Sequence, residues 1–495
     1  MPQADLFAAV DLGSNSFRLE IGRLENGHLR RIEYLKDTVR QGNGLDAEHQ
    51  LSAEAMARGW ACLARFGERL AGWPAAQVRA VATQTLREAR NREVFLQRAQ
   101  ALLGHPIEVI TGREEARLIY LGVTHFLPET EERRLVVDIG GRSTELIVGQ
   151  GHQPRWMQSY PVGSVSWSMQ HFADGRWSRA ALRTAEVAAQ AVLDEALSHC
   201  PRSAWDQAYG CSGTVGAVAD VLQAQGWPAG RISTQALDWL QAQLLEAGAP
   251  ERLRLAGLKD DRRPVMAGGL AVLRAVFTLL HIDELQVAQG ALRHGALFDL
   301  LERENPGTDV RARMIGWLAA HFEVDAPHSA RVARTALHLF DLLSAGQAND
   351  AERRQLHWAA QVHEIGLHIA HSEYHKHGAY ILEHTDLAGF TVDELHRLGL
   401  LVLGQRGKLR KLGAALDELS MARPLLALRL AVLLGHARRD PDLQGLQLQW
   451  APTSPGFVLQ LPGDWAQRYP QSAHLLHEEQ IAWGKSPWPL QVLGL

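Results

Sequence analysis

The sequence predicts an α/β protein in which two lobes of one design surround a cleft, followed by a helical domain and a small α+β segment. Three observations support this prediction. A pattern of thirteen residues recurs at a domain-length offset, a strand-to-helix pattern recurs at nearly the same offset, and histidine-rich helical patterns begin after residue 305. A chain of 495 residues has room for about three or four domains. The expected domains are the first lobe at 1–128, the second lobe at 129–304, the helical domain at 305–440 and the α+β segment at 441–495.

The bulk composition is that of a folded globular protein, with 46% hydrophobic and 21% charged residues. The net charge of -4 excludes a surface that binds polyanions everywhere, so an anionic ligand must be held by a local positive site. The three cysteines lack metal-type spacing and favour a reducing compartment. No signal peptide is expected, and the apolar stretch Leu425–Leu434 is interrupted by Arg429 and too short to span a bilayer. We therefore expect a cytoplasmic protein without a transmembrane segment; peripheral membrane association stays open.

The first recurrence aligns Val10–Gly22 with Val137–Gly149, which lies 127 residues further along, with six of thirteen positions identical. In each copy an apolar run ends in Asp, a Gly/Ser turn follows, and a second strand leaves, which predicts a β-hairpin. The outer ends of these hairpins fall at 25–27 and 150–151. Small residues let backbone N–H groups surround an anion. One such turn is a common hairpin, but two at a domain offset favour a phosphate held between two lobes. The predicted phosphate-binding residues of the two turns are Gly13, Ser14, Asn15, Ser16, Gly140, Gly141, Arg142, Ser143 and Thr144.

The second recurrence places hydroxyl groups where a strand passes into a helix. The strand 78–83 leads into a helix at 84–87, and the strand 207–210 leads through 211–214 into the helix 215–222. Helix N-termini with free N–H groups favour anions. We therefore expect Arg87 in the first lobe and Ser212, Gly213 and Thr214 in the second to contact phosphate. The alternative for Arg87 is an ordinary exposed arginine on a helix.

Six motifs in order resemble the exopolyphosphatase / guanosine pentaphosphate phosphatase family, which belongs to the actin, sugar kinase and heat-shock ATPase superfold. They are Asp11–Ser16, Thr83–Arg87, Gly112–Leu118, Asp138–Glu145, Ser212–Thr214 and Gly290–Gly295. The resemblance is strong from residue 5 to about 300 and weaker beyond. It implies two ribonuclease H-like lobes around a cleft, a helical HD-like domain, Mg²⁺ dependence, hydrolysis of terminal phosphoanhydrides and a homodimer. The motifs are specific for the family and much less so for the member.

Glu115 is the candidate for activating water, because phosphoanhydride hydrolysis needs a positioned nucleophile and neutralised phosphoryl charge. A strand at 107–110 and a helix from 113 are expected. Thr111 and Glu114 fit a capping box, which leaves Glu115 for the cleft. The resemblance places the catalytic glutamate at the same position. The alternative is that both glutamates only complement the helix dipole.

Asp138 and Glu145 are predicted to hold Mg²⁺ and position water, since both side chains can approach the second turn and Mg²⁺ takes one or two protein carboxylates. Asp11 is the equivalent carboxylate of the first lobe and is expected to contact the ion through water. Glu145 has the alternative of a solvent-facing strand residue. Whether a monovalent cation such as K⁺ assists stays open.

Two positions depart from the resemblance. Arg142 stands where the family usually has glycine, and arginine is poorly suited to a positive φ. We expect Arg142 to keep the turn in a conformation open to any residue and to add a cation near phosphate. Ala288-Gln289 precede Gly290 where the family often has Ser-Asp, which puts the role of Gln289 in doubt.

The C-terminal region begins at a predicted boundary, Glu304–Gly307, and holds 14 of the 23 histidines. Helices are expected at 332–343 and 352–367. Six residues resemble an HD-type metal region, although a working HD site pairs His with Asp where this chain has His-Glu: His328, His363, Glu364, His371, His375 and His377. The alternative is a helical domain with buried and surface histidines. The final segment contains a strand at 456–461 and is assigned no chemistry.

A compact basic run is the candidate track for a long polyphosphate chain. Its cations are Arg406, Lys408, Arg410 and Lys411. The alternative is a solvated helix face or loop.

Exopolyphosphatase is the leading functional hypothesis, and guanosine pentaphosphate phosphatase is the close alternative, because both use one cleft. A kinase-like ATPase is disfavoured because the second lobe lacks a convincing adenosine-binding glycine motif. A non-catalytic polyphosphate or alarmone sensor is disfavoured by Glu115, Asp138 and Glu145. No nucleic-acid partner is expected.

Overall fold

The computed structural model describes residues 6–25, 28–128, 130–303, 309–344, 349–385, 387–451 and 455–495. The chain forms two compact units, Met1–Asp309 and Val310–Leu495. The predicted turn at Asn26-Gly27 and the predicted boundary at 304–307 lie outside the described residues.

The first lobe is built on a five-stranded sheet with the order β3-β2-β1-β4-β5. Strands β1 and β2 form the predicted hairpin, with Leu12 opposite Phe17 across the turn. Strands β1, β4 and β5 run parallel, so helical crossovers must connect them. The elements are β1 (Leu6–Leu12), β2 (Phe17–Glu25), β3 (His28–Asp37), α1 (Ala53–Leu70), β4 (Val78–Ala82), α2 (Gln84–Glu88), α3 (Arg92–Leu103), β5 (Ile107–Val109) and α4 (Gly112–Thr124).

The second lobe repeats this plan on a six-stranded sheet with the order β10-β11-β9-β6-β7-β8. Strands β6 and β7 form the second predicted hairpin, with Ile139 opposite Thr144, and β9 runs parallel to β6. Its strands are β6 (Arg133–Ile139), β7 (Thr144–Gln150), β8 (Gln153–Tyr160), β9 (Gln207–Cys211), β10 (Arg231–Ser233) and β11 (Glu284–Val287). Its helices are α5 (Ser164–His171), α6 (Arg179–Leu193), α7 (Ala196–His199), α8 (Ser212–Ala224), α9 (Thr234–Ala247), α10 (Met266–Leu280) and α11 (Leu292–Arg303).

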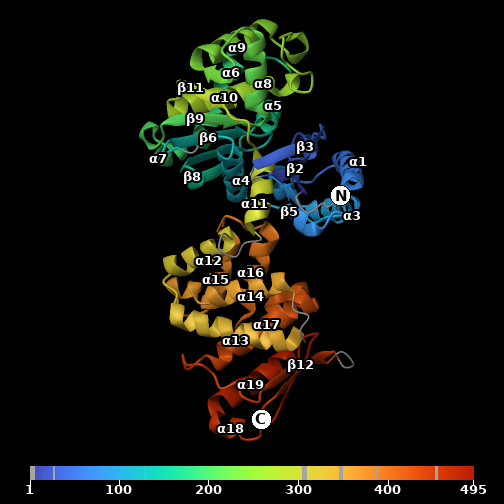
Figure 1. Ribbon diagram of the computed structural model, residues 1–495, viewed down its shortest axis with the longest axis vertical. Helices are drawn as coiled ribbons and strands as arrows, with labels where there is room; N and C mark the ends of the chain where they lie inside the picture. The colour runs from blue at the N-terminus through green and yellow to red at the C-terminus, as the bar shows by residue number, and fades with distance from the viewer. Residues whose placement is uncertain are drawn as a thin grey trace. The chain divides into compact units, whose positions relative to one another are not determined.

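The helices α4 and α11 cross each other where the lobes meet, and each packs on the sheet of the other lobe (Figure 1). Helix α4 follows the first sheet but contacts β7 and β8, whereas α11 follows the second sheet but contacts β1 and β4. A Cβ atom at Gly295 would lie 1.8 Å from the carbonyl oxygen of Leu118, and one at Gly290 would lie 2.0 Å from that of Gly122. The Gly290–Gly295 motif therefore lets the two helices approach closely.

One helical segment of the described chain, Arg263–Leu280, includes α10 and has the length and composition of a membrane span. In this fold 67% of it is buried, and Ala267, Leu270 and Val276 belong to the hydrophobic core of the second lobe. Helix α10 is therefore apolar because protein surrounds it on most sides.

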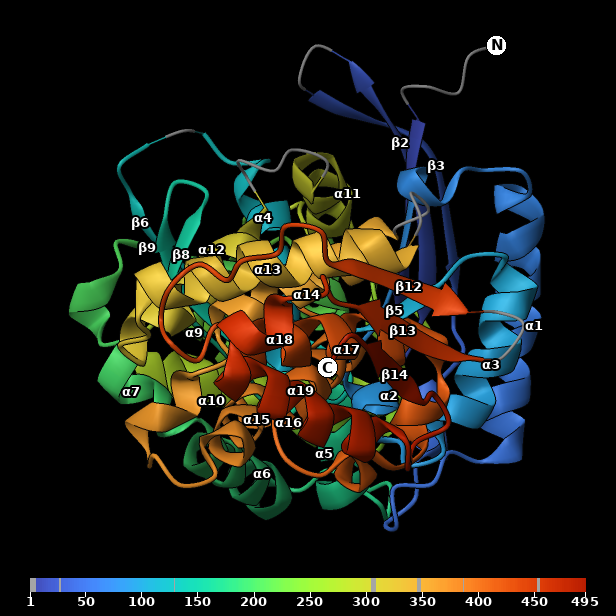
Figure 2. The ribbon, with the colours of Figure 1, turned by 90° about the horizontal axis from the view of Figure 1, so that it is seen from below.

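The second unit is helical with a three-stranded sheet at its end, of order β12-β13-β14 (Figure 2). One hydrophobic core joins both parts, and the buried Arg429 of α17 binds Glu479 of α19. The predicted helix 332–343 lies within α13, the predicted helix 352–367 ends early at α14, and the predicted strand is β13. The elements are α12 (Val310–His321), α13 (Ala326–Ser344), α14 (Asp350–Gln361), α15 (Tyr374–His384), α16 (Val392–Gly404), α17 (Leu419–Leu434), β12 (Gln447–Ala451), β13 (Gly456–Gln460), α18 (Trp465–Arg468), α19 (Pro470–Trp483) and β14 (Leu490–Leu493).

Candidate active site

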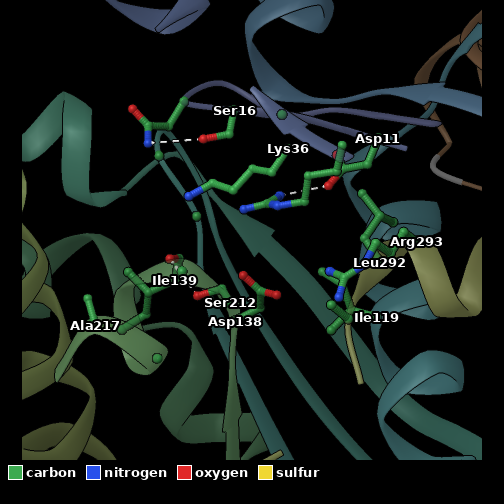
Figure 3. Close-up of a pocket in the computed structure, with 18 of the residues that line it drawn as sticks. Asp11, Ser16, Lys36, Ile119, Asp138, Ile139, Ser212, Ala217, Leu292 and Arg293 are labelled. Atoms are coloured by element: carbon green, nitrogen blue, oxygen red, sulfur yellow. Dashed lines mark hydrogen bonds and ion pairs between the residues drawn. The ribbon is translucent and has the colours of Figure 1, made fainter. Parts of the chain in front are cut away.

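A cavity of about 380 Å³ lies between the two lobes of the first unit, and both hairpin turns open into it (Figure 3). The structure thus brings together most of the residues that the recurrences predict. The predicted residues that line the cavity are Asp11, Gly13, Ser14, Asn15, Ser16, Glu115, Asp138, Gly140, Gly141, Ser143, Ser212 and Gly213. In Figure 3, Asp11 comes from one lobe, and Asp138 and Ser212 come from the other.

The two turns share one backbone arrangement. A Cβ atom at Gly13 would lie 3.1 Å from the carbonyl oxygen of Ser16, and one at Gly140 would lie 3.1 Å from that of Ser143. Neither glycine has a positive φ, so space around the turn is what favours glycine here. The repeated sequence therefore encodes a repeated tight turn with backbone N–H groups near the cavity.

Glu115 lies in the first turn of α4 and lines the cavity. Thr111 caps this helix as predicted, because its hydroxyl accepts a hydrogen bond from the Glu114 N–H at 3.1 Å. The predicted second half of the capping box is replaced: the buried Glu114 carboxylate accepts hydrogen bonds from Arg117 at 2.7 Å and Arg79 at 3.2 Å. The Glu114 side chain is therefore buried among arginines, whereas Glu115 lines the cavity.

Burial raises the pKa of Glu115 to about 7, although the Arg87 guanidinium opposes this shift. Arg87 donates a hydrogen bond from Nη1 to Oε2 of Glu115 at 3.0 Å and another to the carbonyl oxygen of Ile110. A carboxylate whose pKa lies near neutrality can accept a proton and also release it at physiological pH. The position suits a general base.

Asp138 and Glu145 lie directly opposite each other in the β6–β7 ladder, so their side chains share one face of the sheet. The Cys211 thiol donates a hydrogen bond to Oδ2 of Asp138 at 3.1 Å, and the Ser159 hydroxyl donates to Oε1 of Glu145 at 2.7 Å. Burial raises the pKa of Asp138 to about 6. Burial, then the charges of Glu115 and Asp138, raises the pKa of Glu145 well above its usual value.

The predicted Mg²⁺ ligands fit such an ion by their chemistry. The pKa of Glu145 is raised by burial and by the charges of Glu115 and Asp138, and the pKa of Asp138 is raised by burial even though the charge of Arg18 opposes it. A divalent cation would supply further positive charge to these carboxylates. Two carboxylates suffice because Mg²⁺ completes its octahedron with water and substrate oxygens. Asp138 lines the cavity directly, while Glu145 lies behind the lining. The first-lobe carboxylate Asp11 accepts a hydrogen bond from Arg18 at 2.8 Å, so its charge already has a partner.

Four residues predicted to contact phosphate, Arg87, Arg142, Thr144 and Thr214, are not among the residues that line this cavity, so their contact with phosphate stays a prediction. Arg142 has no positive φ, which confirms the predicted conformation of its turn. Its guanidinium, however, binds Glu88 of the first lobe at 2.9 Å and the carbonyl oxygen of Gly42 at 3.2 Å. Arg142 therefore links the two lobes rather than presenting a free cation to phosphate.

Both threonines among these four residues are buried. The hydroxyl of the buried Thr144 donates to the carbonyl oxygen of Val162 at 2.6 Å. Thr214 is buried on α8 and lines a small second cavity together with Arg262, which also lines the main cavity. The Thr144 hydroxyl therefore joins β7 to the segment that follows β8.

Sequence reasoning missed a set of cations in the cavity. They are Arg18, Lys36, Lys259, Arg262 and Arg293. Burial, followed by the nearby Arg18 charge, lowers the pKa of Arg262. A Cβ atom at Gly213 would lie 2.1 Å from Nη2 of Arg262, so this guanidinium covers the start of α8. Arg18 could have been found, because it stands in the first recurrence; the others come from segments without a repeated pattern.

In the second unit, the predicted track residues Arg406, Lys408 and Arg410 are exposed, and burial lowers the pKa of Lys411 to about 8. Arg406 lies over the Tyr374 ring at 5.6 Å. The track stays a prediction. Among the histidines of this unit, His328 and His363 come together with Glu364, whereas His371 is exposed.

Comparisons with known proteins agree with this architecture. The model of the Ppx/GppA phosphatase family matches residues 21–304, and the model of domain III of Ppx/GppA phosphatases matches residues 310–480. A guanosine-5'-triphosphate,3'-diphosphate pyrophosphatase of Vibrio cholerae serotype O1 is 38% identical over 492 residues, which cover 98% of each chain.

Two solved structures are similar to the first unit. An exopolyphosphatase from Cytophaga hutchinsonii is 26% identical with a TM-score of 0.53, covering 60% of this chain and 97% of that one. A Ppx/GppA family member from Aquifex aeolicus is 25% identical with a TM-score of 0.51, covering 61% and 98%. These matches support the ribonuclease H-like, actin-type fold that the resemblance implied.

Proposed function

Because the chain belongs to the Ppx/GppA phosphatase family and is a phosphoanhydride hydrolase, we propose that it removes the terminal phosphate of guanosine pentaphosphate. The sequence alone favoured inorganic polyphosphate as the substrate and kept the nucleotide as the alternative. One observation favours the nucleotide instead: the relative named for the nucleotide reaction matches 98% of the chain at 38% identity.

The proposed mechanism assigns the base to Glu115. A water molecule attacks the terminal phosphorus in line, the bond from phosphorus to the bridging oxygen breaks, and the proton of the water passes to the Glu115 carboxylate. Arg87 orients this carboxylate through its 3.0 Å hydrogen bond. The products are orthophosphate and guanosine tetraphosphate.

The negative charge of the substrate is stabilised by backbone N–H groups, by cationic side chains and by a bound metal ion. Backbone N–H groups of the two turns bind phosphoryl oxygens, and Arg18, Lys36 and Arg262 offset the negative charge that the cavity must accept. Asp138 and Glu145 would hold Mg²⁺, which supplies electrostatic stabilisation of the transferring phosphoryl group. Cys211 and Ser159 hold these carboxylates in place by hydrogen bonds.

Inorganic polyphosphate is the second candidate. It is favoured by the structural likeness to an exopolyphosphatase and by the cations of the cavity, since a linear polyanion needs charge neutralisation but no base-specific contact. Both candidates use the same carboxylates.

The test is phosphate release with Mg²⁺ from guanosine pentaphosphate and from long-chain polyphosphate, at matched concentrations of terminal phosphate. We expect a higher kcat/KM for the nucleotide, with guanosine tetraphosphate as the product identified by chromatography. A higher kcat/KM for polyphosphate would move the assignment to the second candidate. If Glu115→Gln kept both activities at the wild-type level, the mechanism would be wrong.

A further inference from the structure

The second unit contains a buried cluster of two histidines and one glutamate that the proposed function does not use. One ligand atom from each of His328, His363 and Glu364 lies within 4.8 Å of the other two. All three side chains are buried. His328 stands in the first turn of α13, and His363 and Glu364 follow the end of α14, so two separate segments bring the cluster together.

The imidazole nitrogens of this cluster are only partly satisfied. Nδ1 of His363 contacts the carbonyl oxygen of Ala360 at 2.8 Å, so Nδ1 carries the proton and Nε2 keeps its lone pair. That Nε2 atom is buried and has no hydrogen-bond partner among the described residues, and the same holds for Nδ1 of His328. A buried histidine fixed by a backbone carbonyl with its other nitrogen free is the arrangement of a metal ligand.

The charge of Glu364 is balanced by Arg438, which comes from beyond the end of α17. Its guanidinium donates to Oε1 of Glu364 at 3.0 Å and to Oδ2 of Asp325 at 2.7 Å. The Arg438 side chain is 47% exposed, and its backbone has a φ of 52°, which is unusual for arginine. Because this side chain reaches solvent, it can leave Glu364 without opening the core.

We propose that His328, His363 and Glu364 bind a divalent transition-metal ion of the zinc class, with Arg438 as the cation that the metal displaces from Glu364. Two imidazoles and one carboxylate form a ligand set that zinc accepts, with a fourth position left to water or to an oxygen ligand. Imidazole ligands distinguish this site from the oxygen-only set of the cavity, which suits Mg²⁺.

No thiolate competes for the metal in the second unit, because the cysteines are Cys62, Cys200 and Cys211. The bland alternative is a packed pair of core histidines. Against it, core packing does not explain why Nε2 of His363 is buried without a partner among the described residues, in a cluster where Nε2 of His328 lies 3.9 Å from Oε1 of Glu364.

The experiment measures zinc binding to the full chain after treatment with a chelator, by equilibrium dialysis with elemental analysis. Excess Mg²⁺ is present throughout to occupy the carboxylates of the cavity. We expect one zinc equivalent per chain in the wild type. His328→Asn and Glu364→Gln should each weaken binding by more than about tenfold. The control His384→Asn changes an exposed histidine of the same unit and should bind as the wild type does.

The remaining arms keep the proposal falsifiable. Arg438→Ala removes the competing cation and should tighten zinc binding; unchanged or weaker binding would refute the displacement. Co²⁺ in place of zinc should give the visible absorption of a four-coordinate ion without thiolate bands. Circular dichroism confirms that each variant is folded, and Glu364→Gln preserves shape if His328→Asn does not fold. Wild-type binding well below one equivalent, or equal binding in Glu364→Gln, would overturn the site.

Discussion

Arg87 donates a hydrogen bond to Glu115 across the gap between α2 and α4, with 3.0 Å between Nη1 and Oε2. The sequence assigned Arg87 to phosphate, but this contact makes it a positioning residue for the candidate base. Its charge is also the largest influence that lowers the pKa of Glu115 against the effect of burial.

Replacing Arg87 should therefore move the pH dependence of the reaction. The active form of Glu115 is the carboxylate, so kcat should rise with pH through the pKa of about 7. In Arg87→Met that pKa should increase, because the cation that favours the carboxylate is gone. The measurement is kcat against pH for both proteins. A lower kcat with an unchanged apparent pKa in this profile would show that Arg87 acts on phosphate instead.

Glu115→Gln should lower kcat by roughly 10²- to 10⁴-fold with a small change in KM, the loss expected for a general base. The neighbouring Glu114→Gln is the contrast, because Glu114 lies in a buried ion-pair network with Arg79 and Arg117. Breaking that network should lower Tm while the folded fraction keeps its kcat. Steady-state kinetics with thermal unfolding separate the two, and equal losses of kcat would contradict the assignment.

The carboxylates of the second hairpin should make metal-free stability depend on pH. The pKa of Asp138 is about 6 in the folded protein against an ordinary value of 3.8, so the folded state holds this proton more tightly than the unfolded chain. Its contribution to the free energy of unfolding is therefore present below pH 3.8 and is lost as pH rises toward 6. Above that range, Mg²⁺ should restore stability.

Urea unfolding from pH 4 to pH 8, with and without Mg²⁺, tests this linkage against Asp138→Asn, which cannot ionise. We expect the variant to lose less stability across the range and to gain less from Mg²⁺. The same Mg²⁺ gain in the variant and the wild type would place the ion elsewhere.

Arg142 and Glu88 should be energetically coupled, because their side chains join the second hairpin turn to the first lobe at 2.9 Å. Arg142→Ala and Glu88→Ala should each lower the free energy of unfolding. The double variant should lose less than the sum, with a coupling of about 0.5 to 1 kcal/mol for this partly exposed pair. Urea unfolding of the four proteins gives the value. Strict additivity would mean that Arg142 acts alone.

The features that sequence reasoning predicted well are local or repeated. The two hairpins follow from a run of thirteen residues that occurs twice, and the approach of the Asp138 and Glu145 side chains to the second turn follows from that hairpin. Thr111 was recognisable as a helix cap for the same reason, since the contact spans three residues. Such contacts depend on a few neighbouring backbone angles.

The features that were missed depend on how distant segments pack. Nothing near Arg142 indicates that Glu88 lies beside it, 54 residues earlier. Lys36 and Arg262 line the cavity but belong to segments outside both recurrences. Their place beside the cavity depends on how the two lobes pack, which the sequence does not indicate. Likewise, the sequence identified Gly295 only as part of a family motif. The structure shows that glycine is needed there because α4 and α11 cross at this residue.

Gly295→Ala should destabilise the first unit strongly, because the new Cβ atom would lie 1.8 Å from the carbonyl oxygen of Leu118. Backbone on both helices would have to move apart, and the two helices connect the lobes that form the cavity. We expect a lower Tm together with a loss of kcat/KM. The matched control is Gly316→Ala in the helix α12, where a Cβ atom meets nothing within 4 Å. There alanine should raise the free energy of unfolding by about 0.5 to 1 kcal/mol, the usual gain when alanine replaces a glycine within a helix.

Thermal unfolding and kinetics of both variants complete the test. A Gly295→Ala protein as stable as the wild type would show that the helices can separate without cost.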